Sequence, residues 1–189
     1  MHELILGGQR SGKSRCAEWR AARWLVQPDR SAVLLATALA GDAEMVARIA
    51  QHRADRARRV PELQAVEEPR ELARTLLQHS APQRLVVVDC LTLWLTNLLM
   101  PWQGAALDAV AWSTVRLTFL DALVVAPGPV LLVSNEIGLG LSPMSAETRR
   151  FVDELGRLHQ DLAARCERVT LMVAGIEVAV KSAAGGESS

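Results

Sequence analysis

Short runs of apolar residues recur along the chain and are separated by longer amphipathic stretches. Continuous runs of this kind, several of them rich in valine, are typical of parallel strands that are covered on both faces. Five such runs predict buried strands, and a weaker sixth lies around residues 63–66. The five are Leu4–Leu6, Ala32–Ala36, Leu85–Val88, Val130–Val133 and Val169–Val173.

The stretches between these runs predict helices. Phe151, Leu155 and Leu158 recur at spacings of three and four, which puts them on one apolar stripe. Pro69 suits the first turn of a helix over residues 70–78, because that position needs no backbone donor. The other predicted helices span Lys13–Val26, Ala43–Arg59, Leu107–Leu123 and Glu147–Arg165.

Alternating strands and helices predict an α/β fold with a mostly parallel central sheet and helices on both faces. The chain of 189 residues has the length of one domain. We place that domain at residues 1–181 and expect residues 182–189, which end in AAGGESS, to form a flexible C-terminal tail. Ligands in such sheets bind beyond the carboxyl ends of the strands, so candidate chemistry is sought there.

The segment GGQRSGKS follows the first predicted strand and opens the first predicted helix. It fits the pattern G-x-x-x-x-G-K-[ST] of a phosphate-binding P-loop, in the context that gives the pattern meaning. Backbone amides and the helix N-terminus would hold the phosphates, Lys13 would reach the β- and γ-phosphates, and Ser14 would ligate Mg²⁺. The alternative is a glycine-rich turn without a ligand. The loop residues are Gly7, Gly8, Gln9, Arg10, Ser11, Gly12, Lys13 and Ser14.

Two acids follow later strands. Asp89 ends LVVVD, where a P-loop protein places the acid that holds Mg²⁺ or its water shell. An ordinary helix N-cap is the alternative interpretation of Asp89. Glu136 follows VLLVSN and suits a general base, a water-positioning group, a substrate contact or a purely structural role. The IGLGLSP segment after it, residues 137–143, is expected to be a mobile loop over the site.

His52 lies among arginines in the second predicted helix. Imidazole can attack phosphorus as a nucleophile, and nearby arginines would neutralise a triphosphate. From local chemistry alone, however, an ordinary surface histidine is the favoured interpretation of His52. His2, His79 and His159 lack a comparable setting.

Composition and charge exclude several classes of function. Lys plus Arg number 21 and so do Asp plus Glu, so no net field attracts nucleic acid or an anionic membrane. No apolar run is long enough for a membrane span, and the first residues lack the features of a signal peptide. The cysteines, Cys16, Cys90 and Cys166, are odd in number and widely spaced, which favours a reducing compartment. We therefore expect a soluble cytoplasmic protein that neither binds nucleic acid nor inserts into a membrane.

Five segments together resemble the bifunctional adenosylcobinamide kinase/adenosylcobinamide-phosphate guanylyltransferase family, whose fold is P-loop NTPase-like. They are GGQRSGKSR, EMVARIAQHRADR, VVVDCLTLWLTNLL, LVSNEIGLGLSP and VAGI, and the similarity spans residues 4–176. The resemblance implies two steps of cobalamin biosynthesis. Adenosylcobinamide is first phosphorylated with ATP or GTP, and GMP is then transferred from GTP onto that phosphate.

The resemblance also implies residue roles. His52 matches the family's guanylylated histidine, and Lys13 and Asp89 match its phosphate-binding and acidic positions. The guanine-nucleotide contacts carry over to the P-loop and to Thr37, Ala38, Arg53, Ala54, Asp55, Arg56 and Glu67.

Members of the family assemble as homotrimers, so the same is expected of this chain. Departures from the family pattern occur at Leu63, Ala65, His159 and Glu177. A kinase that has lost guanylyl transfer, or a RecA-like NTPase switch, are the alternative functions.

Overall fold

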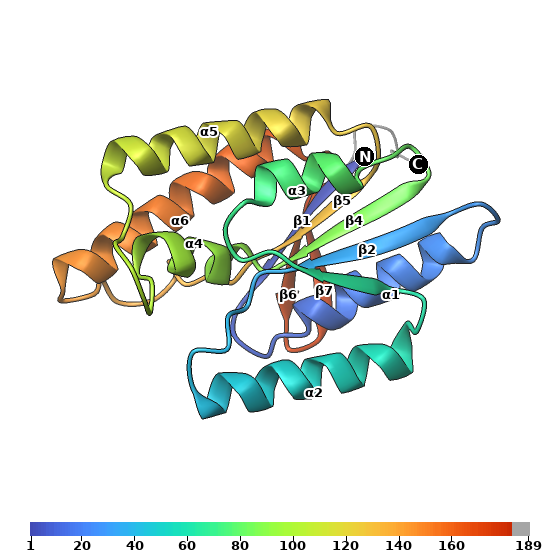
Figure 1. Cartoon of the computed structure of the whole chain (residues 1–189), viewed down its shortest axis with the longest axis horizontal. Helices are drawn as coiled ribbons and strands as arrows, with labels where there is room; N and C mark the ends of the chain where they lie inside the picture. The colour runs from blue at the N-terminus through green and yellow to red at the C-terminus, as the bar shows by residue number, and fades with distance from the viewer. Residues whose placement is uncertain (183–189) are drawn as a thin grey trace.

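Seven strands form a single twisted sheet in the computed structural model, which describes residues 1–182 (Figure 1). The strand order is β3-β2-β4-β5-β1-β6-β7, and only the β6–β7 pair in the described sheet is antiparallel. The strands are β1 (His2–Gly7), β2 (Ser31–Ala36), β3 (Gln64–Glu67), β4 (Arg84–Asp89), β5 (Val130–Val133), β6 (Arg168–Val173) and β7 (Ile176–Lys181). The predicted mostly parallel α/β sheet is confirmed.

Helices cover both faces of the sheet. The α1 and α2 helices lie on one side, and the other four lie on the opposite side (Figure 1). The helices are α1 (Lys13–Leu25), α2 (Ala43–Arg59), α3 (Leu72–His79), α4 (Leu91–Leu99), α5 (Ala109–Val125) and α6 (Ala146–Arg165). Residues 183–189 of the predicted tail lie outside the described part of the chain.

The central strands are buried on both faces, which explains their continuous apolar sequences. Within β1, Leu4 packs into the core under α3–α6, while Ile5 packs into the core under α1. In β4, Val86 and Val88 face the first core and Val87 faces the second. Successive side chains of a strand point to opposite faces, so a two-sided sheet needs apolar residues at every position.

Two elements were not predicted. The α4 helix is apolar nearly all round and seven of its nine residues are buried, so its sequence carries no amphipathic period. The β7 strand is exposed throughout and lies at the sheet edge, where no core imposes alternation.

The α3 helix begins at Leu72, two residues later than the predicted start at residue 70. The Glu68 carboxylate organises the intervening turn. Its Oε1 accepts hydrogen bonds from the backbone amides of Arg70 and Glu71 at 2.9 and 2.7 Å, and its Oε2 accepts one from the Thr75 hydroxyl at 2.9 Å. Burial acts to raise the pKa of Glu68, but these hydrogen bonds outweigh it and hold the pKa below its ordinary value.

Replacing Glu68 with Gln should lower the free energy of unfolding at neutral pH by about 1 kcal/mol, because the amides lose a charged acceptor. Because the pKa of Glu68 is depressed in the folded state, its ionised carboxylate stabilises the fold fully above the unfolded pKa of about 4.3. That stabilisation disappears as the pH falls through the folded pKa. Urea unfolding measured at pH values from about 7 to about 3 should therefore show that the difference in free energy of unfolding between wild type and Glu68→Gln becomes smaller in acid. The exposed Glu71→Gln variant is the control, and a pH-independent gap would contradict this role of Glu68.

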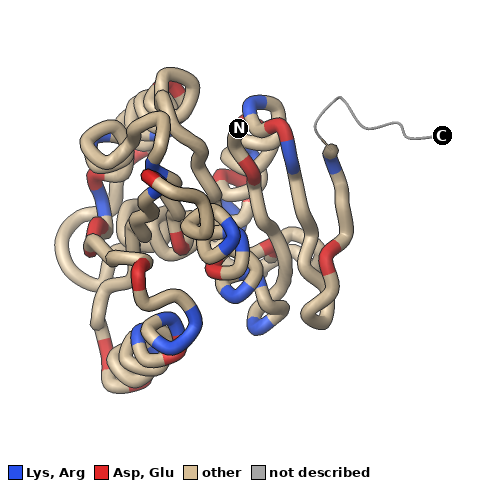
Figure 2. The backbone as a smooth tube through the Cα atoms, turned by 90° about the vertical axis from the view of Figure 1, so that its right-hand side faces the viewer, with Lys and Arg blue, Asp and Glu red and all other residues tan. Residues whose placement is uncertain are grey.

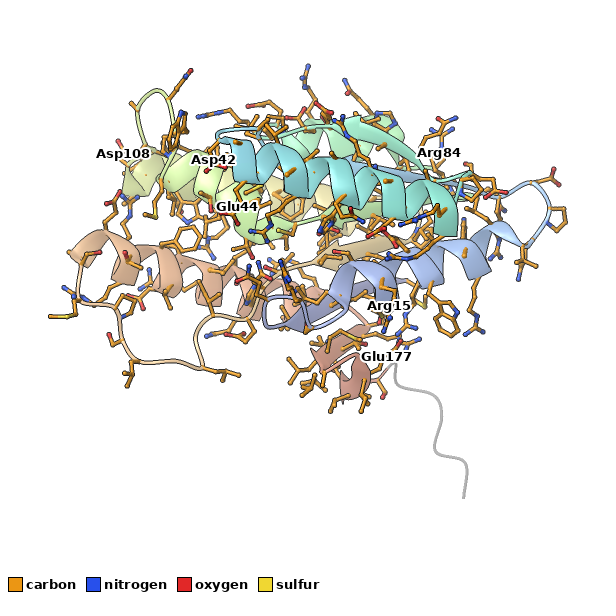
Figure 3. All side chains as sticks on the ribbon, turned by 90° about the horizontal axis from the view of Figure 1, so that it is seen from below. Arg15, Asp42, Glu44, Arg84, Asp108 and Glu177 are labelled. Atoms are coloured by element: carbon orange, nitrogen blue, oxygen red, sulfur yellow. The ribbon has the colours of Figure 1, made fainter. Side chains whose placement is uncertain are left out.

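The hairpin of β6 and β7 braces the segment that follows β1. The Gly175 amide donates to the Ser11 carbonyl at 3.0 Å. Arg20 on α1 forms ion pairs with Glu3 at 2.9 Å and with Glu177 at 2.8 Å, and Glu3 is fully buried. Figure 3 shows Arg15 on α1 near Glu177 on the hairpin. Glu177, one of the departures noted above, thus ties the hairpin to α1.

Candidate active site at the carboxyl ends of the strands

The predicted P-loop connects β1 to α1, and its backbone requires glycine at two positions. Gly7 has φ +151°, and a Cβ there would lie 2.5 Å from the Met172 carbonyl oxygen. Gly12 has φ +101°, a conformation that residues with side chains rarely adopt. The β6–β7 hairpin therefore packs against the loop from behind, and larger residues at these positions would displace it. Glycines in such conformations are what allow the backbone amides of an anion-binding loop to turn toward a phosphate.

Lys13 is the first residue of α1 and is buried. Its Nζ donates a hydrogen bond to the Gly8 carbonyl at 2.6 Å, so the ammonium group bridges the loop. Burial lowers the pKa of Lys13, while Cys90 and Asp89 act in the opposite direction. Asp89 ends β4 and Lys13 follows β1, so both predicted residues lie at the same edge of the sheet, with β5 between their strands.

The residues around Lys13 fit a magnesium ion. Ser14 and Asp89 supply hard oxygen donors, and Mg²⁺ is commonly held by one or two protein oxygens together with substrate phosphates and water. Ser11 Oγ is buried and makes no hydrogen bond, so the loop carries an unpartnered polar atom. Among the described residues, no group of three or more His, Cys, Asp or Glu side chains could hold a metal by itself. A metal at this site would accordingly depend on the nucleotide for most of its ligands.

Thr37, which follows β2, holds the segment after Asp89 in place. Its hydroxyl donates to the Cys90 carbonyl at 2.7 Å and accepts from the Cys90 amide at 2.9 Å. Its carbonyl accepts from Asn97 at 2.8 Å, and its amide donates to the Asp89 carbonyl at 3.2 Å. The residue is fully buried and all its polar groups are engaged. The nucleotide contact expected of Thr37 and of the half-buried Ala38 stays a prediction, and the hydrogen bonds of Thr37 hold the backbone at Asp89 and Cys90.

The α2 helix is the least buried helix, since none of its seventeen residues is buried. The Asp42 carboxylate caps it by accepting from the Met45 amide at 2.7 Å. Near its far end, Arg59 pairs with Glu18 of α1 at 2.5 Å. Figure 3 shows α2 lying alongside α1, with Asp42 and Glu44 at its N-terminal end. It is thus attached to the domain mainly through α1 and is exposed along its length.

Side chains predicted to contact the nucleotide meet at the sheet edge. Arg53 of α2 forms an ion pair with Glu67 at the end of β3, and both are exposed. Asp55 accepts hydrogen bonds from Gln51 at 2.9 Å and from Arg58, and these lower its pKa. Arg56 is half-buried and Ala54 is exposed. The structure brings Arg53 and Glu67 together, while their contact with a nucleotide stays a prediction.

His52 is exposed and, within residues 1–182, makes no hydrogen bond or ion pair with the P-loop. Its place on α2 is nevertheless informative. Met45, Ile49 and Arg56 are half-buried, and helical periodicity puts His52 on the same stripe, facing α1. Both α1 and α2 return from parallel strands, so they run in the same direction (Figure 1).

The Arg59–Glu18 pair fixes how far α2 is displaced along α1. His52 precedes Arg59 by seven residues, a helical rise of about 10 Å. Seven residues before Glu18 is Ser11, which lies in the P-loop just before α1 begins. His52 therefore lies level with the phosphate-binding loop, on the helix next to it.

One functional arrangement was missed by the sequence analysis. His159 is buried on α6, and its ring lies between Ser134 and Glu136. The sequence shows no arginine-rich setting for His159 like that of His52, and this contact with Ser134 and Glu136 was not anticipated. Its neighbours Leu155, Leu158 and Leu162 already mark the buried face of α6, so the signal was a histidine within an apolar stripe. Glu136 itself lies at the predicted place, because its amide donates to the Gly7 carbonyl at 2.9 Å.

A cavity of about 650 Å³ opens at the opposite end of the sheet. It is lined by the C-terminal ends of α1 and α2 and by the amino ends of β2 and β4, including Arg30, Arg59 and Arg84. Figure 3 shows Arg84 at that end of the molecule. Because parallel sheets bind ligands at the carboxyl ends of their strands, we place the candidate active site at the P-loop instead.

The family model for "cobinamide kinase / cobinamide phosphate guanyltransferase" matches residues 3–180. The chain belongs to this family. It is 49% identical over 181 residues to the bifunctional adenosylcobalamin biosynthesis protein CobP of Pseudomonas aeruginosa, covering 96% of this chain and 98% of that protein. It is 36% identical to the bifunctional adenosylcobalamin biosynthesis protein CobU of Escherichia coli, covering 94% and 98%.

Solved structures support the fold of this family member. The flagellar accessory protein FlaH of Methanocaldococcus jannaschii matches with a TM-score of 0.50 at 10% identity, covering 99% of this chain and 81% of that one. The protein PH0250 of Pyrococcus horikoshii matches with a TM-score of 0.56 at 9% identity, covering 96% and 86%. At such identities the similarity concerns the fold alone.

Proposed function

We propose that this cobinamide kinase/guanyltransferase family member catalyses both reactions. It phosphorylates the aminopropanol hydroxyl of adenosylcobinamide with ATP or GTP, and it transfers GMP from GTP onto the new phosphate. The observation that carries the proposal is the position of His52, level with the P-loop on an adjacent exposed helix. A kinase alone needs no nucleophilic side chain there, whereas guanylyl transfer through a histidine does.

The P-loop would hold the triphosphate in both reactions. Residues 7–14 supply backbone amides, and Lys13 supplies positive charge to the phosphates. Bound Mg²⁺, held by Ser14 and Asp89, would neutralise developing phosphate charge. Thr37 maintains the backbone after Asp89 and so keeps this carboxylate in position.

Guanylyl transfer would proceed by two displacements at the α-phosphorus. An imidazole nitrogen of His52 attacks it, the bond to the bridging oxygen breaks, and pyrophosphate leaves. A phosphate oxygen of adenosylcobinamide phosphate then attacks, the P–N bond breaks, and adenosylcobinamide-GDP leaves with the imidazole restored. Arg53, Asp55, Arg56 and Glu67 lie on the same side of the molecule and would bind the guanine nucleotide.

Assembly and location form part of the proposal. We propose a homotrimer, supported by the exposed apolar side chains Ile176, Val178 and Val180 on the edge strand β7. The cysteines of the described chain are free thiols, which suits the reducing cytoplasm. No helix of the described part is long and apolar enough to span a membrane. Acidic and basic residues are interspersed along the chain (Figure 2), as expected for a partner other than nucleic acid.

The direct test supplies purified protein with adenosylcobinamide, ATP and Mg²⁺, and then with GTP. Mass spectrometry should show a product heavier by one phosphate, followed by adenosylcobinamide-GDP and pyrophosphate. Phosphorylation without the second product would reduce the function to a kinase. Nucleotide hydrolysis without either product would favour an NTPase switch.

A further inference from the structure

A chain of hydrogen bonds runs from α4 to α6 beneath the segment that follows β5. His159 Nε2 lies 2.7 Å from Ser134 Oγ, and Ser134 Oγ lies 3.2 Å from Thr92 Oγ1. On the other side of the ring, His159 Nδ1 lies 3.6 Å from Glu136 Oε2. Ser134 is fully buried, so this Ser–His–Glu arrangement cannot use the serine as a nucleophile toward a bound substrate. The end of the chain that reaches the surface is the Glu136 carboxylate.

The surroundings select one tautomer of His159. A carboxylate oxygen faces Nδ1, so a proton there is attracted, whereas a lone pair would be repelled. Ser134 then donates its hydroxyl proton to Nε2 and accepts one from Thr92, whose oxygen accepts the Asn135 amide at 2.8 Å. Burial lowers the pKa of His159, with Glu136 opposing the shift, so the ring is neutral at neutral pH. Every proton in the chain therefore points toward Glu136.

Glu136 is held beside the P-loop. Its amide donates to the Gly7 carbonyl at 2.9 Å, and its Oε1 accepts from the Gly138 amide at 2.7 Å. The β5 strand that precedes it lies between β1, which leads into the P-loop, and β4, which ends at Asp89. Within the described residues no Lys or Arg side chain pairs with Glu136. The carboxylate is thus oriented by neutral donors, with no guanidinium or ammonium group of the described residues in contact with it.

We propose that Glu136 is the general base of the kinase step and that His159 is the residue that positions it; this rests on the proposed kinase function. Glu136 takes the proton from the hydroxyl of adenosylcobinamide. The hydroxyl oxygen forms a bond to the γ-phosphorus, the bond to the β–γ bridging oxygen breaks, and the nucleoside diphosphate leaves. His159 directs its Nδ1 proton toward Oε2 and the Gly138 amide donates to Oε1, and each oxygen keeps a second lone pair that can accept the substrate proton.

Replacing Glu136 with Gln should lower kcat of phosphorylation by about 10²–10⁴-fold, the usual contribution of a general base, with little change in the KM for ATP. The matched control is Glu147→Gln, an exposed carboxylate in the first turn of α6, which should retain wild-type turnover. A Glu136→Gln variant with wild-type kcat would overturn the proposal. So would a loss confined to KM, because that would indicate a binding role.

Two variants of His159 separate positioning from packing. Asn places its amide N–H where Nδ1 stands and can still donate toward Glu136, whereas Gln places its amide near Nε2 and Ser134. The structure predicts that His159→Asn retains kcat within about threefold, while His159→Gln and His159→Ala lose about tenfold or more. Equal losses in the Asn and Gln variants, tracking their thermal unfolding, would mean that His159 serves packing only.

A third measurement needs no substrate. In protein labelled with ¹⁵N-histidine, the nitrogen shifts of His159 should report a neutral ring protonated on Nδ1, and the Nε2-protonated tautomer would overturn the proposal. If wild-type protein fails to phosphorylate adenosylcobinamide, the proposed kinase function is wrong. The tautomer of His159 still tests whether its Nδ1 proton is directed toward Glu136. If wild-type protein is active and Glu136→Gln turns over equally fast, the general-base proposal is wrong while the proposed kinase function stands.

Discussion

Replacing Lys13 with Met should reduce phosphorylation of adenosylcobinamide by at least about 10²–10³-fold. The Lys13 ammonium group is buried and lies across the P-loop on the Gly8 carbonyl, so a bound triphosphate would meet it without a competing counter-ion at short range. In a site of low dielectric, a charge placed where negative charge develops contributes several kcal/mol to the transition state. Methionine preserves the length and apolar stem and removes only the charge.

The chain provides a matched control for this variant. Lys181 is the other lysine in the sequence, and it is an exposed residue at the end of β7 whose Nζ donates to the Ala163 carbonyl at 2.8 Å. Lys181→Met should turn over at the wild-type rate. Initial rates with ATP as donor, measured for both variants, provide the comparison. Unchanged turnover in Lys13→Met would mean that the triphosphate binds elsewhere.

Replacing His52 with Asn should abolish conversion of adenosylcobinamide phosphate and GTP to adenosylcobinamide-GDP. A nucleophile that forms a covalent intermediate has no substitute in a neighbouring amide, so no residual transfer by the same route is expected. Because His52 is exposed on a helix with no buried residues, the substitution should leave the thermal midpoint within a few degrees of wild type. The variant thereby separates chemistry from folding.

His79 is the control for this second prediction. It lies in the last turn of α3, on the opposite face of the sheet from α2. His79→Asn should retain guanylyl transfer, measured as pyrophosphate release that depends on adenosylcobinamide phosphate. Transfer that persists in His52→Asn would require another nucleophile or direct attack on GTP.

The layered sheet was predictable from sequence because its central strands are buried on both faces. Burial at every position leaves continuous apolar runs such as Val86–Val88, and amphipathic helices such as α2 and α6 lie between some of these runs. The same reasoning explains the failure at α4. A helix enclosed on nearly all sides has no polar face, so an apolar segment such as Leu91–Leu99 carries no period to recognise.

Local chemistry predicted the P-loop and Asp89 because each follows a strand at the edge where parallel sheets bind ligands. It could not raise His52 above an ordinary surface residue. What distinguishes His52 is its position on α2 next to the start of α1. That position follows from the ion pair between Arg59 and Glu18, which are 41 positions apart in the sequence. His159 was missed for the same reason, because its partners Ser134 and Glu136 come from a distant strand end.

The central claim is that one P-loop serves a covalent guanylyl transfer through His52. Its most direct test incubates the protein with Mg²⁺ and α-³²P-GTP, quenches in alkali, and maps the label by peptide mass spectrometry. We predict an acid-labile, alkali-stable GMP adduct on the peptide that contains His52, and no label in His52→Asn. A label on another residue, or a label that persists without His52, would contradict this account.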